Sequence, residues 1–190
     1  MEDKKFNPTN KKKLNNPQRL KNIPIEKIVE ILGLNESGNL VDYGAGTGFL
    51  TFRIADEYPN SRIFALDIEE IMIEEMINNA ESDNVFPLQI NDNEMPFSVN
   101  DLLAVWSIAV YHEMKTPEKW LKNVFKSLKP AGKILIIDWS ADQNPELEIG
   151  PPLSHRISVE KIMNDLINAG FKNCTVHDGF TNHFAISGVK

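Results

Sequence analysis

Cysteine is almost absent from this chain of 190 residues, in which Cys174 is the only one. A single thiol cannot form an internal disulfide or a site with several thiolate ligands, and its scarcity suits a reducing compartment. Basic charge is in deficit as well, with 20 Lys and Arg against 27 Asp and Glu. The acidic balance argues against a general nucleic-acid binder, which needs a basic face to displace phosphate counterions.

Long apolar runs are also missing. The longest, residues 102–111, is interrupted by Ser107, whereas a membrane-spanning helix needs about 20 apolar residues. The first 13 residues carry charges with no apolar region behind them, so they do not have the pattern of a signal peptide. We therefore expect a cytoplasmic protein that binds neither nucleic acid nor membrane.

Charge divides the chain into two parts. Residues 1–22 hold seven Lys and Arg and two acids, a net of +5, so residues 23–190 carry −12 of the total of −7. We treat residues 1–22 as a basic N-terminal arm and residues 23–190 as a single domain. For residues 1–13 we favour a solvated arm. For residues 14–22 a solvated arm and an arm that folds over a ligand both remain open.

Helical and strand patterns alternate after the arm. The helical stripes include Ile71 in the third helix and Ile167 in the last, and Thr116 and Ser158 are placed to cap two of the helices. An Asp-Gly pair at residues 178–179 predicts a final hairpin. The alternation predicts an α/β fold in which a mostly parallel sheet is covered on both faces. The expected helices are 25–32, 49–58, 68–80, 116–128 and 158–169, and the expected strands are 40–43, 62–66, 85–90, 102–108, 133–138, 171–177 and 181–187.

A glycine-rich turn joins the first strand to the next helix. The segment reads Val-Asp-Tyr-Gly-Ala-Gly-Thr-Gly-Phe over residues 41–49, so Gly44, Gly46 and Gly48 alternate after Asp42. Glycines let the backbone turn tightly and let a ligand approach, and a helix start offers free N–H groups to an anion. The dinucleotide pattern G-x-G-x-x-G would require a third glycine where Phe49 stands.

An acid follows the second strand at the distance typical of ribose binding. Asp67 ends the segment Arg-Ile-Phe-Ala-Leu-Asp, and a carboxylate there can bind both ribose hydroxyls. Its charge disfavours a 2′-phosphate, which argues against NADP. The alternative for Asp67 alone is a helix cap.

The G-x-G-x-G spacing after Asp42 resembles the first motif of the class I S-adenosylmethionine-dependent methyltransferases. The segment Leu-Lys-Pro-Ala-Gly-Lys-Ile-Leu-Ile-Ile-Asp-Trp at 128–139 also resembles that family, and the likeness is greatest to the type 11 group of ubiquinone/menaquinone-biosynthesis enzymes. The resemblance implies a Rossmann-like three-layer sandwich with strand order 3-2-1-4-5-7-6 and an antiparallel terminal strand. It also implies S-adenosylmethionine as cofactor.

The resemblance further implies which residues bind the cofactor. Asp42 would hold the region around the methionine amino group, and the glycine turn would accept the methionine and ribose portions. Ile68 would pack on the adenine, and Asn91 or Asp92 would bind its amino group, although these two also fit an ordinary polar loop. Trp106 or Ser107 would lie beside the cofactor. The implied cofactor-binding set is Asp42, Tyr43, Gly44, Ala45, Gly46, Gly48, Asp67, Ile68, Asn91, Asp92, Trp106 and Ser107.

Three residues are candidates for the substrate side. His112 follows the fourth strand and can change protonation near neutral pH, so it is our first choice as base; packing at the next helix is the alternative. His155 and Arg156 lie in the long segment 140–157, where Arg156 could hold a carboxylate or phosphate or form a surface ion pair. Methyl transfer requires no metal, and no spacing in the sequence indicates a metal site.

Two other functions stay open at this point. A nicotinamide-dependent oxidoreductase is disfavoured by Phe49 in place of the third glycine. A cofactor-binding protein without catalysis is compatible with the sequence, because methyl transfer obliges the protein mainly to align the reactants. Among the alternatives we favour a methyltransferase acting on a small molecule.

The cofactor assignment yields the first prediction. S-adenosylmethionine and S-adenosylhomocysteine should bind with dissociation constants on the order of micromolar, which is about −8 kcal/mol, and NAD should not bind. Isothermal titration calorimetry with the three compounds measures this. Heat from NAD together with none from either sulfur compound would overturn the assignment.

Overall fold

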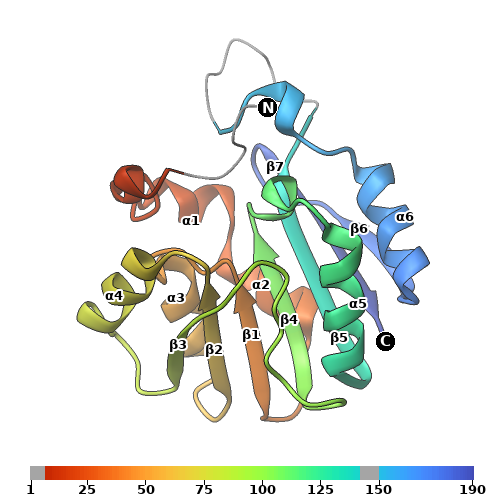
Figure 1. The fold of residues 1–190 in the computed structure, drawn as a ribbon, viewed down its shortest axis with the longest axis horizontal. Coiled ribbons are helices and arrows are strands. Elements are labelled where there is room, and N and C mark those ends of the chain that lie inside the picture. The colour runs from red at the N-terminus through yellow and green to blue at the C-terminus, as the bar shows by residue number, and fades with distance from the viewer. Residues whose placement is uncertain (1–6, 142–149) are drawn as a thin grey trace.

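The computed structural model describes residues 7–141 and 150–190, without the side chains of residues 8–10. Helices and strands alternate in it as expected (Figure 1). No helix in these two stretches is long and apolar enough to cross a membrane. In chain order the elements are η1 (Pro8–Lys13), α1 (Gln18–Asn22), α2 (Ile25–Leu32), β1 (Asn39–Tyr43), α3 (Phe49–Glu57), β2 (Arg62–Asp67), α4 (Glu70–Asn78), β3 (Val85–Gln89), β4 (Leu102–Ile108), η2 (Tyr111–Glu113), α5 (Pro117–Ser127), β5 (Leu128–Trp139), η3 (Leu153–His155), α6 (Val159–Ala169), β6 (Lys172–His177) and β7 (His183–Val189).

One seven-stranded sheet forms the centre of the fold, with the order β3-β2-β1-β4-β5-β7-β6. β1 pairs in parallel with β2 and β4, and the outer pairs β2–β3 and β4–β5 are also parallel. β7 runs antiparallel to both β5 and β6. The predicted fold class, a Rossmann-like sandwich with an antiparallel terminal strand, is therefore confirmed.

Two hydrophobic cores lie on opposite faces of the sheet. The first includes Ile28 of α2, Ile54 of α3 and Met76 of α4. The second includes Trp120 of α5 and Leu166 of α6. β4 is buried along its whole length because helices cover both of its faces. The carboxyl ends of the central parallel strands consequently meet at one edge of the sheet, where η1, η2 and η3 also lie (Figure 1).

Local signals set most helix ends, with one exception. Gly33 ends α2 in a left-handed conformation, and the hydroxyl of Ser158 accepts a hydrogen bond from the backbone N–H of Lys161 at the start of α6. Thr116 does not cap α5 with its side chain. Its hydroxyl instead accepts a hydrogen bond from the amide of Asn93, so the predicted cap was wrong because a distant loop binds the same oxygen.

Two predicted inward-facing side chains point outward. Ile71 is 41% exposed, since α4 begins only at Glu70 and turns Met72 and Met76 toward the core. Ile167 is 55% exposed, because the buried stripe of α6 runs through Leu166 and one residue along a helix is a rotation of about 100°. When two adjacent residues of a helix are both apolar, the sequence alone does not show which of the two is buried.

The arm packs against the domain over its described part. η1 lies beside α4, where Lys11 forms an ion pair with Glu75. The backbone N–H of Thr181 donates to the carbonyl of Asn22, which links the end of α1 to the segment before β7. Residues 8–13 therefore differ from the solvated arm that we expected, and residues 1–6 lie outside the described residues. Residues 14–22 pack against the domain, and their folding over a ligand stays a prediction.

Candidate functional site

The glycine turn after β1 has a backbone that other residues would strain. Gly44, Gly46 and Gly48 all have positive φ angles, of 76°, 59° and 78°. A Cβ atom at Gly44 would lie 2.5 Å from the side chain of Val110. At Gly46 it would lie 3.0 Å from Leu14 of the arm. The turn is thus a narrow cradle between the β4–α5 connection and the arm, and a side chain would fill it.

Asp67, at the end of β2, is bound directly to this turn. Its Oδ2 accepts the backbone N–H of Gly46 at 2.8 Å, and its Oδ1 accepts that of Glu69 at 3.0 Å. Burial raises the pKa of Asp67, and the two backbone hydrogen bonds oppose that shift. Glu69, the residue that caps α4, makes no side-chain cap bond. Asp67 thus connects the turn to the start of α4, and each of its oxygens keeps a lone-pair direction for a further donor.

Asp42, at the end of β1, is 3% exposed and accepts the hydroxyl of Thr51 at 2.7 Å. Burial raises its pKa to about 6. Thr51, Trp106 and Arg19 oppose the shift, and Asp67 adds to it. Sequence reasoning missed Thr51, although its position in the first turn of the helix after the last glycine is a usable signal. A buried acid that is half neutral near pH 6 is suited to bind a cation.

Trp106 and Ser107 of β4 occupy the strand next to this acid. Trp106 is the register partner of Asp42 in the β1–β4 pair. The hydroxyl of Ser107 is buried without a hydrogen-bond partner among the described residues, whereas the indole of Trp106 lies near enough to Asp42 to lower the pKa of that acid. The side chains of Trp106 and Ser107 alternate along the strand and point to opposite faces of the sheet. Their place beside the cofactor stays a prediction.

Tyr43 contributes to the turn through its backbone only. Its ring belongs to the second core, with its centroid 5.0 Å from that of Trp120, and its hydroxyl accepts the backbone N–H of Asn93 at 2.9 Å. The alternation of side chains along a strand sends Tyr43 to the face opposite Asp42. Ala45, in contrast, packs at the edge of the first core, and its N–H donates to the carbonyl of Leu66 at 2.9 Å. Ile68 is half-buried at the edge of the second core.

The loop after β3 is organised differently from the expectation. The amide and backbone N–H of Asn91 both donate to Glu94, and Asp92 is exposed. Asn93 is the buried member, held at a φ of 60° by its bonds to Tyr43 and Thr116. These hydrogen bonds do not test the expected contact of Asn91 or Asp92 with the adenine, which stays a prediction.

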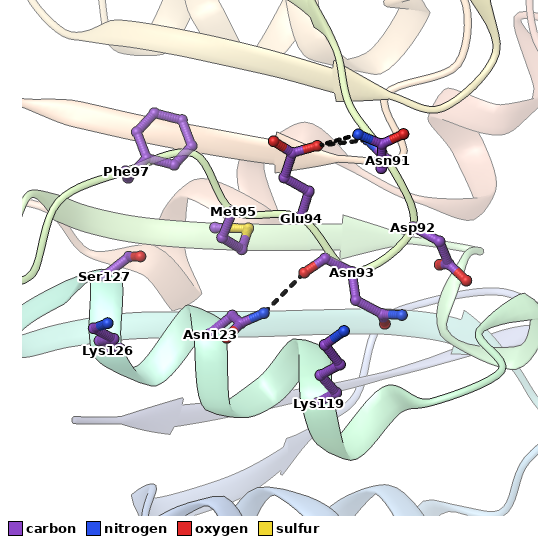
Figure 2. A pocket seen from close by; sticks show the side chains of 10 residues that line it. All are labelled: Asn91, Asp92, Asn93, Glu94, Met95, Phe97, Lys119, Asn123, Lys126 and Ser127. Carbon is purple, nitrogen blue, oxygen red and sulfur yellow. Dashed lines mark hydrogen bonds between the residues drawn. The ribbon is translucent and has the colours of Figure 1, made fainter.

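A hollow of about 430 Å³ lies between this loop and α5 (Figure 2). Asn91 and Asp92 line it together with residues of α5 such as Lys119, and the amide of Asn123 donates to the carbonyl of Asn93 across one side. None of the turn glycines lines the hollow. It is therefore a separate depression at the side of the fold, and the site described here centres on the turn.

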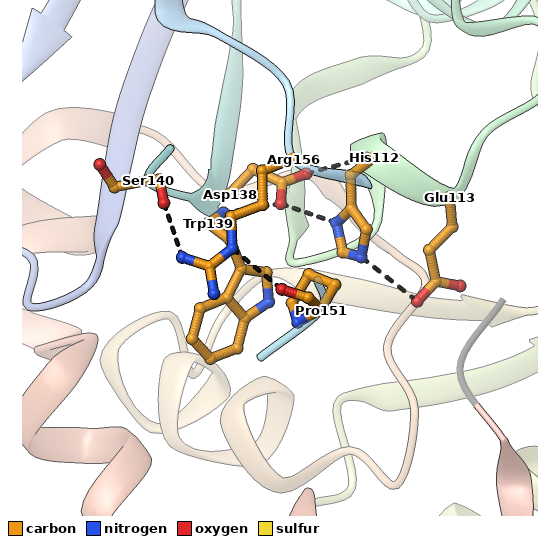
Figure 3. A network of polar contacts seen from close by, with 7 residues as sticks. All are labelled: His112, Glu113, Asp138, Trp139, Ser140, Pro151 and Arg156. Atoms are coloured by element: carbon orange, nitrogen blue, oxygen red, sulfur yellow. Dashed lines mark hydrogen bonds and ion pairs between the residues drawn. The ribbon is translucent and has the colours of Figure 1, made fainter. Parts of the chain in front are cut away.

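His112 lies in η2, at the edge where β4 and β5 end. Its ring Nδ1 is 2.7 Å from Oδ1 of Asp138, and its backbone N–H donates to Oδ2 of the same carboxylate at 3.0 Å (Figure 3). Nε2 lies 3.7 Å from Oε1 of Glu113. His112 and Asp138 are both buried. Two carboxylates thus flank one imidazole. Sequence reasoning placed Asp138 at a strand end without connecting it to His112.

Arg156 braces the segment that follows β5. Its guanidinium donates to the carbonyls of Ser140 at 2.8 Å and Pro151 at 3.0 Å, and it lies over the ring of Trp139 (Figure 3). Contact of Arg156 with the substrate and its alternative, a surface ion pair, both stay predictions. His155 is half-buried in η3 and is not part of this polar network. Residues 142–149 of this segment lie outside the described residues.

His183 also borders this region. Its ring is stacked on Trp139 with 4.1 Å between centroids, and its Nδ1 is 2.8 Å from the carbonyl of Thr181. Burial lowers the pKa of His183, so it is neutral near pH 7. No group of three or more His, Cys, Asp or Glu in the described stretches could hold a metal ion.

A comparison with known proteins decides which chemistry this turn belongs to. A family model described as a methyltransferase domain matches residues 34–177. The chain belongs to this methyltransferase family. The match confirms the predicted resemblance to the class I, type 11 enzymes, whose cofactor is S-adenosylmethionine, and it leaves the nicotinamide-dependent alternative without support.

The relatives show how far the likeness extends. The solved structure of a SAM dependent methyltransferase from Aquifex aeolicus is 26% identical, with a TM-score of 0.88, and the alignment covers 97% of this chain and 99% of that one. Such coverage leaves little room to omit the arm, so the likeness includes it.

Curated relatives match over shorter stretches. The ubiquinone/menaquinone biosynthesis C-methyltransferase of Wigglesworthia glossinidia brevipalpis is 30% identical over 112 residues, which are 56% of this chain and 44% of that protein. The malonyl-[acyl-carrier protein] O-methyltransferase of Hahella chejuensis is 25% identical over 143 residues, which are 70% of this chain and 50% of that protein. The chain spans about half the length of these curated relatives.

The geometry of Asp67 generates the second prediction. Asp67→Ala should weaken the binding of S-adenosylhomocysteine at least about tenfold, because a hydrogen bond to a charged group is worth about 1.5–3 kcal/mol. It should also lower the free energy of unfolding by about 1–3 kcal/mol, since two backbone N–H groups lose their acceptor. Calorimetry and chemical denaturation measure the two effects. A dissociation constant equal to that of the wild type would leave Asp67 with the structural role alone.

The raised pKa of Asp42 generates the third prediction. If Asp42 takes the ammonium group of the cofactor, binding below pH 6 must first remove a proton from the carboxyl group. The affinity for S-adenosylmethionine should therefore fall by about tenfold per pH unit below about 6 and be flat above it. Calorimetry at pH 5, 6 and 7 checks this slope. The matched variant Asp42→Asn should bind weakly at all three values, and a pH-independent affinity in the wild type would contradict the assignment.

Proposed function

We propose that the protein transfers the methyl group of S-adenosylmethionine to a small molecule, and that His112 accepts the proton that the nucleophile loses. The observation that supports the second part is the buried pair of His112 and Asp138, with 2.7 Å between Nδ1 and Oδ1. S-adenosylmethionine supplies an electrophilic methyl group on a sulfonium. The tasks left to the chain are to hold the reactants in line and to remove a proton where the nucleophile carries one.

The partners of His112 define its role. An ionised carboxylate only accepts hydrogen bonds, so the short contact to Asp138 assigns the N–H of the imidazole to Nδ1. Nε2 is then the basic nitrogen. When it takes a proton, the resulting imidazolium lies between Asp138 and Glu113, and both carboxylates stabilise it. This arrangement supports catalysis over the alternative that His112 only packs at the next helix.

The base is also connected to the cradle for the cofactor. Val110, two residues before His112, forms one wall of the glycine turn at Gly44. Ligands of open parallel sheets bind outside the carboxyl ends of the strands, which is the edge that carries Asp42, Asp67 and His112. We therefore assign the cofactor to the ends of β1 and β2, and the acceptor molecule to the neighbouring ends of β4 and β5.

The acceptor itself is proposed only as a class. One relative is named as a C-methyltransferase and another as an O-methyltransferase, so the relatives do not favour one methylated atom. A base beside the methyl group suits a nucleophile that carries a proton, such as a phenol or an activated ring carbon. We further propose a cytoplasmic location, on the single cysteine, and action as a monomer or homodimer without nucleic-acid or membrane partners.

His155 and Arg156 take a different place in this proposal. Arg156 is bound to the carbonyls of Ser140 and Pro151, so we assign it to positioning these two residues beside the acceptor. His155 remains a candidate for contact with the acceptor.

The fourth prediction tests catalysis directly. S-adenosylmethionine labelled in its methyl group is incubated with the protein and a panel of phenols, hydroquinones, amines and carboxylates, and labelled products are identified by mass spectrometry. With an accepted compound, His112→Asn should lower kcat at least about a hundredfold, the usual contribution of a general base, and leave cofactor affinity within about twofold.

The matched control for this variant is His177→Asn, on the terminal hairpin, where the ring bonds to Ser187. It should leave kcat near that of the wild type. Cofactor binding without turnover of any compound would favour the alternative of a non-catalytic S-adenosylmethionine-binding protein. A wild-type kcat in His112→Asn would show that the residue is structural.

A further inference from the structure

Arg19 is a half-buried cation that has no role in the chemistry proposed above. It belongs to α1 in the arm, and its Nη1 donates to the carbonyl of Leu14 at 2.8 Å. Leu14 is the residue whose Cδ1 faces Gly46, at 3.0 Å from the position of a Cβ there. The neighbouring Asn15 bonds to the hydroxyl of Thr47 in the same turn. Arg19 is therefore bound to Leu14, and both Leu14 and its neighbour Asn15 contact the glycine turn.

The carboxylate of Asp42 is the negative group that interacts electrostatically with Arg19. Burial lowers the pKa of Arg19 to about 10, and the attraction of Asp42 opposes the shift. Arg19 in turn favours the ionised form of Asp42. Among the contacts of the described residues, however, no ion pair joins the two side chains. Arg19 and Asp42 thus both lie near the glycine turn, and they do not form an ion pair with each other.

Such a separated pair matches one chemical feature of the cofactor. The methionyl end carries an ammonium and a carboxylate on the same carbon atom, so its two charges are fixed a few bonds apart. When the methionyl carboxylate loses its hydration on binding, it requires a cation that has unused hydrogen-bond donors. A guanidinium has five N–H donors in a planar arrangement.

We infer that Arg19 binds the carboxylate of the methionyl group while Asp42 takes the ammonium, so that the arm and β1 together form a subsite for an amino-acid zwitterion. This inference rests on the proposed use of S-adenosylmethionine. The arm then has a function in cofactor selection, because compounds that contain adenosine but lack the carboxylate form no ion pair with Arg19.

The test compares three adenosine compounds on four proteins. The compounds are S-adenosylhomocysteine, its decarboxylated analogue, and 5′-methylthioadenosine, which lacks the whole amino-acid group. The proteins are the wild type, Arg19→Met, Arg19→Lys and Lys21→Met. Lys21 is an exposed cation of the same helix, so its variant removes one charge from the arm without reaching the turn.

The wild type should bind S-adenosylhomocysteine at least about tenfold more tightly than the decarboxylated analogue. Arg19→Met should lose most of this ratio, Arg19→Lys should keep part of it, and Lys21→Met should keep all of it. Affinity for 5′-methylthioadenosine should stay within about twofold in all four proteins, which also shows that the turn is folded.

Each other result overturns the inference in a recognisable way. An unchanged ratio in Arg19→Met means that Arg19 does not contact the carboxylate. An equal loss for all three compounds means that Arg19 only folds the arm onto the turn. A wild type that binds none of the three compounds overturns the inference together with the proposed function, whereas binding without a changed ratio overturns the inference alone.

Discussion

The hydrogen bond from the backbone of Gly46 to the carboxylate of Asp67 is the contact on which the geometry of the site depends. It fixes the glycine turn of β1 to the end of β2, and the carbonyl of Leu66 accepts the N–H groups of Gly44 and Ala45 beside it. A turn of glycines has a large conformational entropy to lose, so a rigid acceptor on the neighbouring strand is needed to define one conformation. The carboxylate that orders the turn is the same group that we expect to bind the ribose, so the shape of the site and its expected binding chemistry depend on one residue.

The sequence predicted the fold well because strong, local signals define it. β4 was located to the residue by an apolar run that only a doubly covered strand would carry, and Gly33 and Gly170 ended their helices as expected. The errors occurred where a tertiary partner decides between local options. The hydroxyl of Thr116 binds Asn93 and does not cap α5, and Ile167 is turned outward because its neighbour Leu166 already fills the inward position.

The candidate site was predictable only in part, for a related reason. A motif fixes which residues lie near the cofactor, so the glycines, Asp42 and Asp67 could be named from their spacing. It does not fix which side of the sheet a side chain takes: Tyr43 belongs to the motif, yet its ring lies in the opposite core. Nor does it connect residues that are distant in sequence. The pairing of His112 with Asp138 spans 26 positions and exists only because β4 and β5 end side by side.

The cofactor and the acceptor are assigned to different strand ends, and this explains why the sequence identifies the first and not the second. In the proposed function, the cofactor side is formed by the ends of β1 and β2, where the glycines and acids of the motif stand at fixed spacings. The acceptor side would be formed by the end of β5, with Trp139, and by the segments that carry His112 and Arg156. Methyl transfer asks of these segments only that they align a nucleophile and, where needed, accept its proton. Many side chains can meet that requirement, so a family pattern identifies the cofactor, whereas the identity of the acceptor is carried by contacts that each protein of the fold can build differently.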